Sequence, residues 1–372
     1  MLNEAITQSP VVVFTGAGAS QPLGFALMDS FMDMLEGEAD STQFQVLQKI
    51  YSEYRLPNGS PGRDLEVVVE SLTRYHETLR LMDNDPNFEG LRPYLHLELP
   101  FIGQPAGKGF PDIVGPLDDM TRDLIFREYG KDVAEGTNVA DLYGPLFRTV
   151  RRFGRHRVIP VFTTNYDRAI ETFADQAGVP IEYGFQPGHT RSIWNPERFH
   201  DYRAPDSKYA LVLFKLHGSV TWYKDGRTVR SVAAAQRDLS GWENMLIYPG
   251  ETKTGVLEEP YHTCFTYLRH CLYHARCCLV IGYSFRDLFI QRVFQEAADV
   301  NPELRILIMN GTDHRAVASQ IKELRPEATT LLYRFEAESA SYLPEFRDRL
   351  VAFLPKARSV PTPAAGADGE PQ

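Results

Sequence analysis

The fold of this chain is set by residues 11–20, VVVFTGAGAS. Val11–Phe14 are four apolar residues in a row, three of them β-branched, which is typical of a strand buried on both faces of a parallel sheet. The strand runs directly into Gly16–Ser20, a Gly-x-Gly-x-Ser turn, and a helical pattern follows from about 27 to 35. This order brings backbone N–H groups close to a phosphate, because glycine lacks the Cβ that would block the approach. Gln21 stands where the dinucleotide fingerprint has its third glycine, so a tight strand-to-helix turn explains the motif alone equally well.

Composition and charge indicate a folded protein that lacks the overall positive charge typical of nucleic-acid-binding proteins. The 372 residues are 43% hydrophobic and 12% aromatic, enough for one large α/β domain with an insertion or for two domains. The net charge of −10 gives no general attraction for a polyanion. Arg151–Arg157 is a local basic segment that we interpret as a solvated helix end before a strand, with direct nucleic-acid binding left open.

Nothing in the sequence indicates secretion or a membrane. Residues 1–5 lack the features of a secretion signal, and no apolar run approaches the ~20 residues of a membrane span. Four cysteines do not make a disulfide scaffold. We therefore expect a cytoplasmic, soluble protein that does not bind a membrane.

The rest of the chain predicts a doubly wound, Rossmann-like parallel sheet. Residues 30–150 are dominated by helical periodicity and predict a large helical insertion after the first strand-helix unit, with a loop at 100–116. Further apolar strands and their helices follow in alternation. The predicted strands are 158–162, 211–216, 278–281, 304–309 and 329–335, with helices at 258–274 and 344–353. We expect one domain over 1–355 and a disordered tail over 356–372.

Small or polar residues follow the first strand, at Gly16–Ser20, and also the next four predicted strands where each of them ends. The clusters are Thr163–Asp167, His217–Ser219, Gly282–Ser284 and Asn310. In an open α/β sheet, ligands bind at the carboxyl ends of the strands, near the point where the strand order reverses. The sequence therefore predicts a nucleotide site along this edge.

Five motifs in this order resemble those of the sirtuin-like NAD-consuming family. They are Gly16-Ala17-Gly18, Asn165-x-Asp167, His217-Gly218, Gly282-x-Ser284 and the late Asn310. The resemblance implies NAD as the substrate and Asn165, Asp167 and His217 as the catalytic residues. The NAD-binding residues that it implies are Thr15, Gly16, Ala17, Gly18, Ser20, Thr164, Asn165, Asp167, Gly282, Tyr283, Ser284 and Asn310.

The chemistry of cleaving a nicotinamide–ribose bond fits these residue types. An asparagine amide such as Asn165 can hold a water or a ribose hydroxyl, and the resemblance assigns the nicotinamide carboxamide to Asp167. His217, with an ordinary pKa of ~6.5, can take a proton near neutral pH. The simpler alternative is that Asn165 and Asp167 cap the next helix and that His217 is a structural histidine.

Two departures indicate which branch of the family the chain resembles. Sirtuin-type deacylases carry a zinc ribbon of two Cys-x-x-Cys pairs, whereas this chain has none, so no zinc is expected. Its cysteines all lie within 264–278, where buried free thiols are the ordinary explanation and a site with His270 and His274 is the alternative. After the glycine turn the chain has Gln21–Phe25 instead of the deacylase Gly-Ile-Pro-Asp-Phe-Arg type segment.

Zinc-free sirtuin-like domains with a helical insertion resemble the bacterial antiphage NAD hydrolases. That branch implies an NAD glycohydrolase held inactive by a homo-oligomer or by a partner such as a HerA-type ATPase, with the insertion as the expected contact surface. Two other functions remain open at this point. One is an NAD-dependent protein deacylase or ADP-ribosyl transferase, and the other is a nucleotide-binding assembly subunit of an ATPase or nuclease complex.

Overall fold

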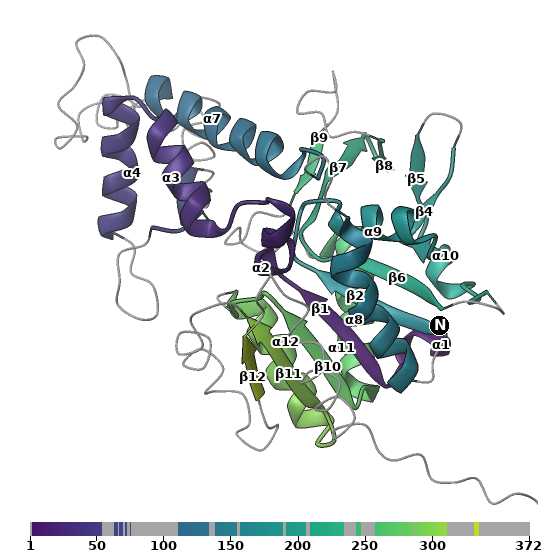
Figure 1. Ribbon diagram of the computed structural model, residues 1–372. Helices are drawn as coiled ribbons and strands as arrows, with labels where there is room; N and C mark the ends of the chain where they lie inside the picture. The colour runs from purple at the N-terminus through teal and green to yellow at the C-terminus, as the bar shows by residue number, and fades with distance from the viewer. Residues whose placement is uncertain are drawn as a thin grey trace, which may run out of the picture.

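A computed structural model describes residues 2–53, 63–65, 67–69, 71–72, 75, 111–133, 138–154, 157–188, 191–205, 209–233, 243–246, 257–285, 287–310 and 331–334. Within these residues, seven strands form one parallel sheet in the order β12-β11-β10-β1-β2-β6-β3 (Figure 1). The strands are β1 (Val11–Thr15), β2 (Val158–Thr163), β3 (Ile181–Glu182), β6 (Ala210–Lys215), β10 (Cys277–Ile281), β11 (Arg305–Asn310) and β12 (Leu331–Arg334). From β1 the chain proceeds one way to β2 and β6, and the other way to β10, β11 and β12. This confirms the doubly wound α/β fold.

Alternation along β1 explains how both faces of the sheet are filled. Val11 and Val13 pack with α8 (Val139–Gly154) and α9 (Ala169–Ala177) on one face. Val12 and Phe14 pack on the other face with the second pair of helices. These are α11 (Tyr261–His274) and α12 (Leu288–Val300), joined by the short α1 (Glu4–Thr7). Every residue of β1 is buried, which is why Val11–Phe14 form a continuous apolar run before Thr15.

The predicted helical insertion forms a separate apolar cluster beside the sheet (Figure 1). It contains α3 (Met28–Glu38), α4 (Ser41–Glu53) and α7 (Pro111–Tyr129). Arg63 joins this body by ion pairs to Asp33 (2.5 Å) and Glu36 (2.7 Å) of α3. The last helix before β2, α8, packs on the sheet instead. It ends at Gly154, four residues before β2 begins at Val158, which confirms a helix end before a strand in the basic segment.

The predicted loop at 100–116 is wrong over its last residues, because α7 begins at Pro111. Proline is well accepted at the first helical position, where its missing N–H would be unpaired in any case. Pro116 lies inside the helix and removes one bond from a helix of 19 residues. Residues 100–110, the predicted helix at 344–353 and the tail at 356–372 lie outside the described residues.

A second, antiparallel sheet was not predicted from the sequence. Of the described residues, five short strands pair in the order β4-β5-β8-β7-β9. They are β4 (Phe185–Gln186), β5 (Ser192–Trp194), β7 (Gly218–Asp225), β8 (Thr228–Ser231) and β9 (Glu243–Leu246); two short helical segments, α2 (Ala17–Ser20) and α10 (Glu197–His200), complete the elements used below. Since β7 begins directly after His217, this residue lies at the junction of the two sheets. In the part of the chain described here we find no helical segment with the length and hydropathy of a membrane span.

Candidate functional site

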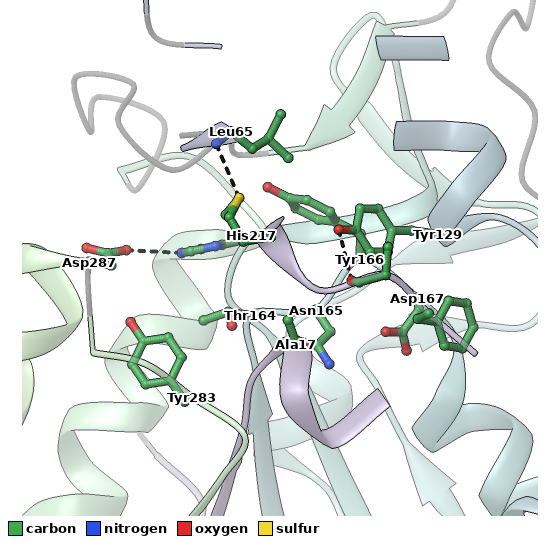
Figure 2. A pocket seen from close by; sticks show the side chains of 13 residues that line it. Ala17, Leu65, Tyr129, Thr164, Asn165, Tyr166, Asp167, His217, Tyr283 and Asp287 are labelled. Atoms are coloured by element: carbon green, nitrogen blue, oxygen red, sulfur yellow. Dashed lines mark hydrogen bonds and ion pairs between the residues drawn. The ribbon is translucent and has the colours of Figure 1, made fainter. Parts of the chain in front are cut away.

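The predicted catalytic residues share one pocket at the carboxyl ends of the central strands (Figure 2). The cavity has a volume of about 100 Å³. Its lining combines residues from the strand ends with residues from the helical insertion. They are Ala17, Phe25, Ala26, Met28, Leu65, Tyr129, Thr164, Asn165, Tyr166, Asp167, His217, Tyr283 and Asp287. Six of these, Ala17, Thr164, Asn165, Asp167, His217 and Tyr283, are among the residues that the sequence predicts for the site.

The glycines of the first motif join two turns of the fold. Gly16 and Gly18 donate backbone hydrogen bonds of 2.9 Å to the carbonyl oxygens of Ile281 and Gly282. A Cβ on Gly18 would lie 2.8 Å from the Cα of Gly282, which is closer than side chains pack. These two N–H groups therefore hold the end of β10 against the end of β1. That the Gly16–Ser20 turn holds a pyrophosphate stays a prediction.

Three other predicted binding residues lie near the strand ends but outside the lining of the cavity. Thr15 is buried at the end of β1, and its backbone carbonyl accepts from the backbone of Thr164 at 3.2 Å. Ser284 is half-buried in the segment that follows β10. Asn310 is the last residue of β11, opposite Arg334 of β12, and its side chain lies outside the description. None of the three lines the cavity described above.

Asn165 is oriented by two hydrogen bonds from its amide nitrogen. Nδ2 donates to the carbonyl oxygen of Gly16 and to Oγ of Ser20, both at 3.0 Å. A carbonyl oxygen only accepts, so the atom facing Gly16 has to be the nitrogen. Oδ1 of Asn165 is consequently left as an acceptor at the pocket, and no described residue donates to it. This is the orientation needed to hold a hydroxyl or a water.

Asp167 combines a capping contact with a raised pKa. Its Oδ1 accepts a 2.9 Å hydrogen bond from the backbone of Ala169, the first residue of α9, although the N-cap position itself is Arg168. Burial raises the pKa of Asp167 above its ordinary value, and the nearby Lys215 cation, the Ala169 N–H and the Ser20 hydroxyl lower it in part. Asp167 therefore holds a proton more tightly than an exposed aspartate does.

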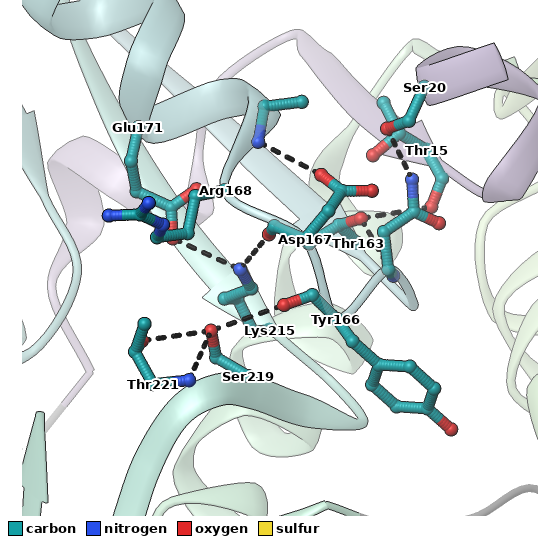
Figure 3. A network of polar contacts seen from close by, with 12 residues as sticks. Thr15, Ser20, Thr163, Tyr166, Asp167, Arg168, Glu171, Lys215, Ser219 and Thr221 are labelled. Carbon is teal, nitrogen blue, oxygen red and sulfur yellow. Dashed lines mark hydrogen bonds and ion pairs between the residues drawn. The ribbon is translucent and has the colours of Figure 1, made fainter. Parts of the chain in front are cut away.

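Lys215 is a buried cation beneath the site that the sequence reasoning missed. Only 1% of its surface is exposed, and Nζ donates to the backbone carbonyl of Asp167 and to Oε1 of Glu171 (3.0 Å) (Figure 3). The signal in the sequence was a lysine at the end of the apolar strand LVLFKL, 211–216. A buried charge of this kind needs partners, and here the partners hold the segment that carries Asp167.

His217 faces a second missed residue, Asp287. Nε2 of His217 lies 3.3 Å from Oδ2 of Asp287, and both side chains are buried (Figure 2). Asp287 is the N-cap of α12, where its Oδ1 accepts from the backbone of Phe289 (2.7 Å) and Ile290 (3.3 Å). An aspartate directly before an apolar helical run is an N-cap signal that the sequence displays.

The connection from β10 to α12 is tightly curved, which returns Asp287 to the pocket. Gly282 has φ +62° and Phe285 has φ +57°. A left-handed backbone is rare for a residue with a side chain, and such residues gather at functional sites. Phe285 is fully buried and packs edge-to-face on Tyr283, a pocket residue, with ring centroids 5.0 Å apart.

The helical insertion and the segment just before it supply the apolar wall of the pocket. Tyr129, the last residue of α7, contacts Tyr166 edge-to-face with ring centroids 5.9 Å apart. Its hydroxyl donates to the carbonyl oxygen of Ala26 at 3.4 Å, and Glu128 accepts from the backbone N–H of Ala26 at 2.8 Å. Phe25 and Met28 line the pocket on either side of Ala26. The result is an apolar surface opposite the polar strand ends.

The four cysteines are free and buried, as the ordinary explanation predicted. Cys264 and Cys271 lie on α11, and Cys277 and Cys278 on β10. Burial raises the pKa of every one of these thiols, to about 12 for Cys277. Among the residues that the structure describes, no group of three or more His, Cys, Asp or Glu side chains could hold a metal ion.

Comparison with known proteins gives one family match. The sequence model of a family described as SIR2-like domain matches residues 160–329. No curated protein matches the chain. Among solved structures, a Sir2 homologue in complex with NAD aligns with a TM-score of 0.41 and 14% identity, over 94% of this chain and 93% of that chain.

Two further solved structures align in the same range. A Sir2 enzyme, from work on the mechanism and regulation of these enzymes, has a TM-score of 0.41 and 14% identity, over 94% of this chain and 95% of that one. A sirtuin from work on substrate affinity has a TM-score of 0.39 and 14% identity, over 92% and 93%. The family match is more informative than the structural alignments, because the matched range includes Asn165, Asp167 and His217. Residues 160–329 of this chain thus match the model of a SIR2-like domain.

Proposed function

We propose that this protein is an NAD glycohydrolase, which cleaves the bond between nicotinamide and ribose and releases nicotinamide and ADP-ribose. The observation that carries the proposal is the convergence of Asn165, Asp167 and His217 on one pocket. The SIR2-like match over 160–329 supports it. An asparagine acceptor, a buried carboxyl group and a histidine are the groups that this cleavage needs close together.

The cleavage depends on positioning more than on covalent chemistry. The C–N bond to the cationic nicotinamide ring breaks, its electron pair leaves with the ring nitrogen, and the ribose carbon becomes oxocarbenium-like. The oxygen of a water then bonds to this carbon, and one of the water's protons passes to a base. Oδ1 of Asn165 would hold the water or a ribose hydroxyl, and His217 would take the proton. The products are nicotinamide, ADP-ribose and one proton.

The remaining pocket residues suit the leaving ring. Asp167 would face the carboxamide of nicotinamide, and the apolar wall of Phe25, Met28 and Tyr129 would cover the flat ring. A cavity of about 100 Å³ has room for the ring but not for a whole dinucleotide. The rest of NAD would therefore extend along the Gly16–Ser20 turn, with Ser284 and Asn310 as further contacts.

We also propose a setting for this activity in the cytoplasm, in antiphage defence by NAD depletion. Such an enzyme has to stay inactive until infection, so control would come from a homo-oligomer or from a partner such as a HerA-type ATPase. The helical insertion would be the contact surface, because its end forms one wall of the pocket. A partner bound to α3, α4 or α7 could thereby change the site.

The test is to follow NAD loss and its products by chromatography, with and without candidate partner proteins. The proteins are the wild type, Asn165→Ala and His217→Ala, with His274→Ala as the matched control, because His274 is an exposed histidine at the end of α11. We expect nicotinamide release by the wild type and by the control, and a loss of about 10²-fold or more in the two site variants.

Two other outcomes would count against the proposal. If nothing consumes NAD even with a partner, while calorimetry shows that NAD binds, the protein is a nucleotide-binding assembly subunit. If all variants cleave NAD equally, the catalytic residues lie elsewhere.

A further inference from the structure

Asp287 makes two different contacts with its two carboxyl oxygens. Oδ1 accepts from the backbone N–H groups of Phe289 (2.7 Å) and Ile290 (3.3 Å) at the first turn of α12. Oδ2 lies 3.3 Å from Nε2 of His217. Because the helix end fixes Oδ1, the carboxyl group is held in one orientation, and Oδ2 is presented to the histidine ring.

This arrangement assigns the proton of the neutral His217 ring. A carboxylate oxygen accepts but does not donate, so the nitrogen that faces it, Nε2, carries the hydrogen. Nδ1 is then the ring nitrogen with a lone pair. No described residue forms a hydrogen bond with Nδ1, which leaves this atom to accept a proton.

We propose that Asp287 is the positioning residue of His217: it holds the ring in the Nε2–H tautomer and stabilises the imidazolium that forms when Nδ1 takes a proton. The inference rests on the proposed function, in which that proton comes from the attacking water or a ribose hydroxyl. The 3.3 Å contact is an ion-pair distance and not an aligned N–H···O bond, and catalytic contacts of this kind often align and shorten only when the substrate is bound. The same division of roles between an aspartate and a histidine is known from hydrolytic triads.

The competing explanation is that Asp287 only caps α12, and Asp287→Asn separates the two roles. Asparagine caps a helix about as well as aspartate, so its amide oxygen can keep the contacts with Phe289 and Ile290. Its NH₂ group then faces Nε2 of His217 and donates, which forces the hydrogen onto Nδ1. Asp287→Ser also keeps a capping side chain but is too short to contact the ring.

A matched control is available at another helix. Asp40 precedes α4, and its Oδ1 accepts from the backbone of Thr42 and Gln43, both at 2.8 Å. Asp40→Asn therefore removes one capping charge without touching the pocket. We expect it to leave His217 and NAD cleavage unchanged.

The first readout is the tautomer of His217 by NMR of ¹⁵N-histidine-labelled full-length protein at pH 8, with the His217 signals assigned from their absence in His217→Gln. We expect the Nε2–H form in the wild type and in Asp40→Asn, the Nδ1–H form in Asp287→Asn, and a mixture in Asp287→Ser. An Nδ1–H form or a doubly protonated ring in the wild type, or an unchanged tautomer in Asp287→Asn, would overturn the proposal.

The second readout is steady-state cleavage of NAD. We expect Asp287→Asn to lower kcat by about 10² to 10⁴-fold with a much smaller change in KM, because the wrong tautomer impairs proton transfer rather than binding. An unchanged kcat in a variant whose tautomer has reversed would contradict the catalytic part of the proposal. A wild type that shows the expected tautomers but never cleaves NAD would instead refute the proposed function, so the two failures are distinguishable.

Discussion

The backbone N–H of Gly18 donates a 2.9 Å hydrogen bond to the carbonyl oxygen of Gly282. This bond joins the turn after β1 to the turn after β10, and both turns lie at the pocket through Ala17 and Tyr283. The approach is so close that a Cβ on Gly282 would lie 2.2 Å from the backbone nitrogen of Ala19. The two glycines therefore determine how near the first motif and the fourth motif of the site come to each other.

Gly282→Ala should destabilise the protein more than an equivalent change elsewhere. Gly226 is the matched control, because it has φ +61° against +62° for Gly282, yet nothing lies within 4 Å of a Cβ placed on it. We expect Gly226→Ala to cost about 1–2 kcal/mol from backbone strain alone. Gly282→Ala should cost at least about 2 kcal/mol more, because the backbone of Gly18 and Ala19 cannot move aside cheaply.

Urea unfolding of the two variants measures this difference. If Gly282→Ala does not fold, Gly18→Ala, with its milder 2.8 Å contact, should show an intermediate loss of stability. Equal losses for Gly282→Ala and Gly226→Ala would mean that the two turns can separate.

The central strands could be predicted because they are buried on both faces. The sequences of β1, β2, β6 and β10 are apolar except for a final Thr or Lys in the first three, and each strand is followed by a polar cluster that the topology places at one edge. The predicted catalytic residues Asn165, Asp167 and His217 followed from this rule together with the family resemblance. Strand ends were therefore sufficient to locate the pocket.

Other features depend on contacts that a linear pattern does not display. Strands β4, β5, β8 and β9 have two to four residues each, too few for a periodic pattern to show. Lys215 and Asp287 contact the site through residues far away in the chain, Glu171 and His217. The start of α7 was missed because proline was taken as a loop signal, although proline also begins helices.

Asn165→Asp should damage the site more than its small chemical change suggests. The atom that faces Gly16 O and Ser20 Oγ would change from a donor to an acceptor, and two oxygens would then lie about 3.0 Å apart without a hydrogen between them. We expect a loss of about 1–3 kcal/mol in stability and of at least about 10²-fold in NAD cleavage. Asn165→Ala should lose similar activity with a smaller loss of stability.

Urea unfolding and NAD loss, measured on both Asn165 variants, test this. Asn195→Ala changes an asparagine outside the pocket and is the control for effects that do not depend on the site. Wild-type stability in Asn165→Asp would show that the amide nitrogen does not face Gly16.

The four thiols should be inert in the folded protein. All four are buried, and burial raises the pKa of each, so almost no reactive thiolate is present near pH 8. We expect a thiol reagent such as Ellman's reagent to modify no cysteine in the native state and four after unfolding in urea. Rapid native modification of Cys277 or Cys278 would mean that β10 opens readily, contrary to its place beside β1.

Asp167 should make the protein less stable as pH rises. Its pKa is raised in the folded state from an ordinary value of 3.8, mainly by burial, so the native protein binds this proton more tightly than the unfolded chain does. Protonated Asp167 therefore stabilises the fold at low pH. That contribution is lost as pH rises from the ordinary value through the raised one, because the unfolded state then releases the proton first.

Asp167→Asn should remove this pH dependence and separate stability from activity. The amide oxygen can still accept from Ala169 N–H, while the buried charge is gone. We expect the stability of the variant minus that of the wild type to be larger at pH 7.5 than at pH 4.5. We also expect the variant to have lost NAD cleavage, because the nicotinamide contact is altered. Urea unfolding at the two pH values measures this difference. The control is Asp175→Asn, which replaces an exposed aspartate on the same helix and shows how much the loss of any carboxylate changes the pH dependence of stability. A variant that loses stability relative to the wild type as pH rises would mean that Lys215 holds Asp167 as a charged partner, and that burial is the weaker of the two effects.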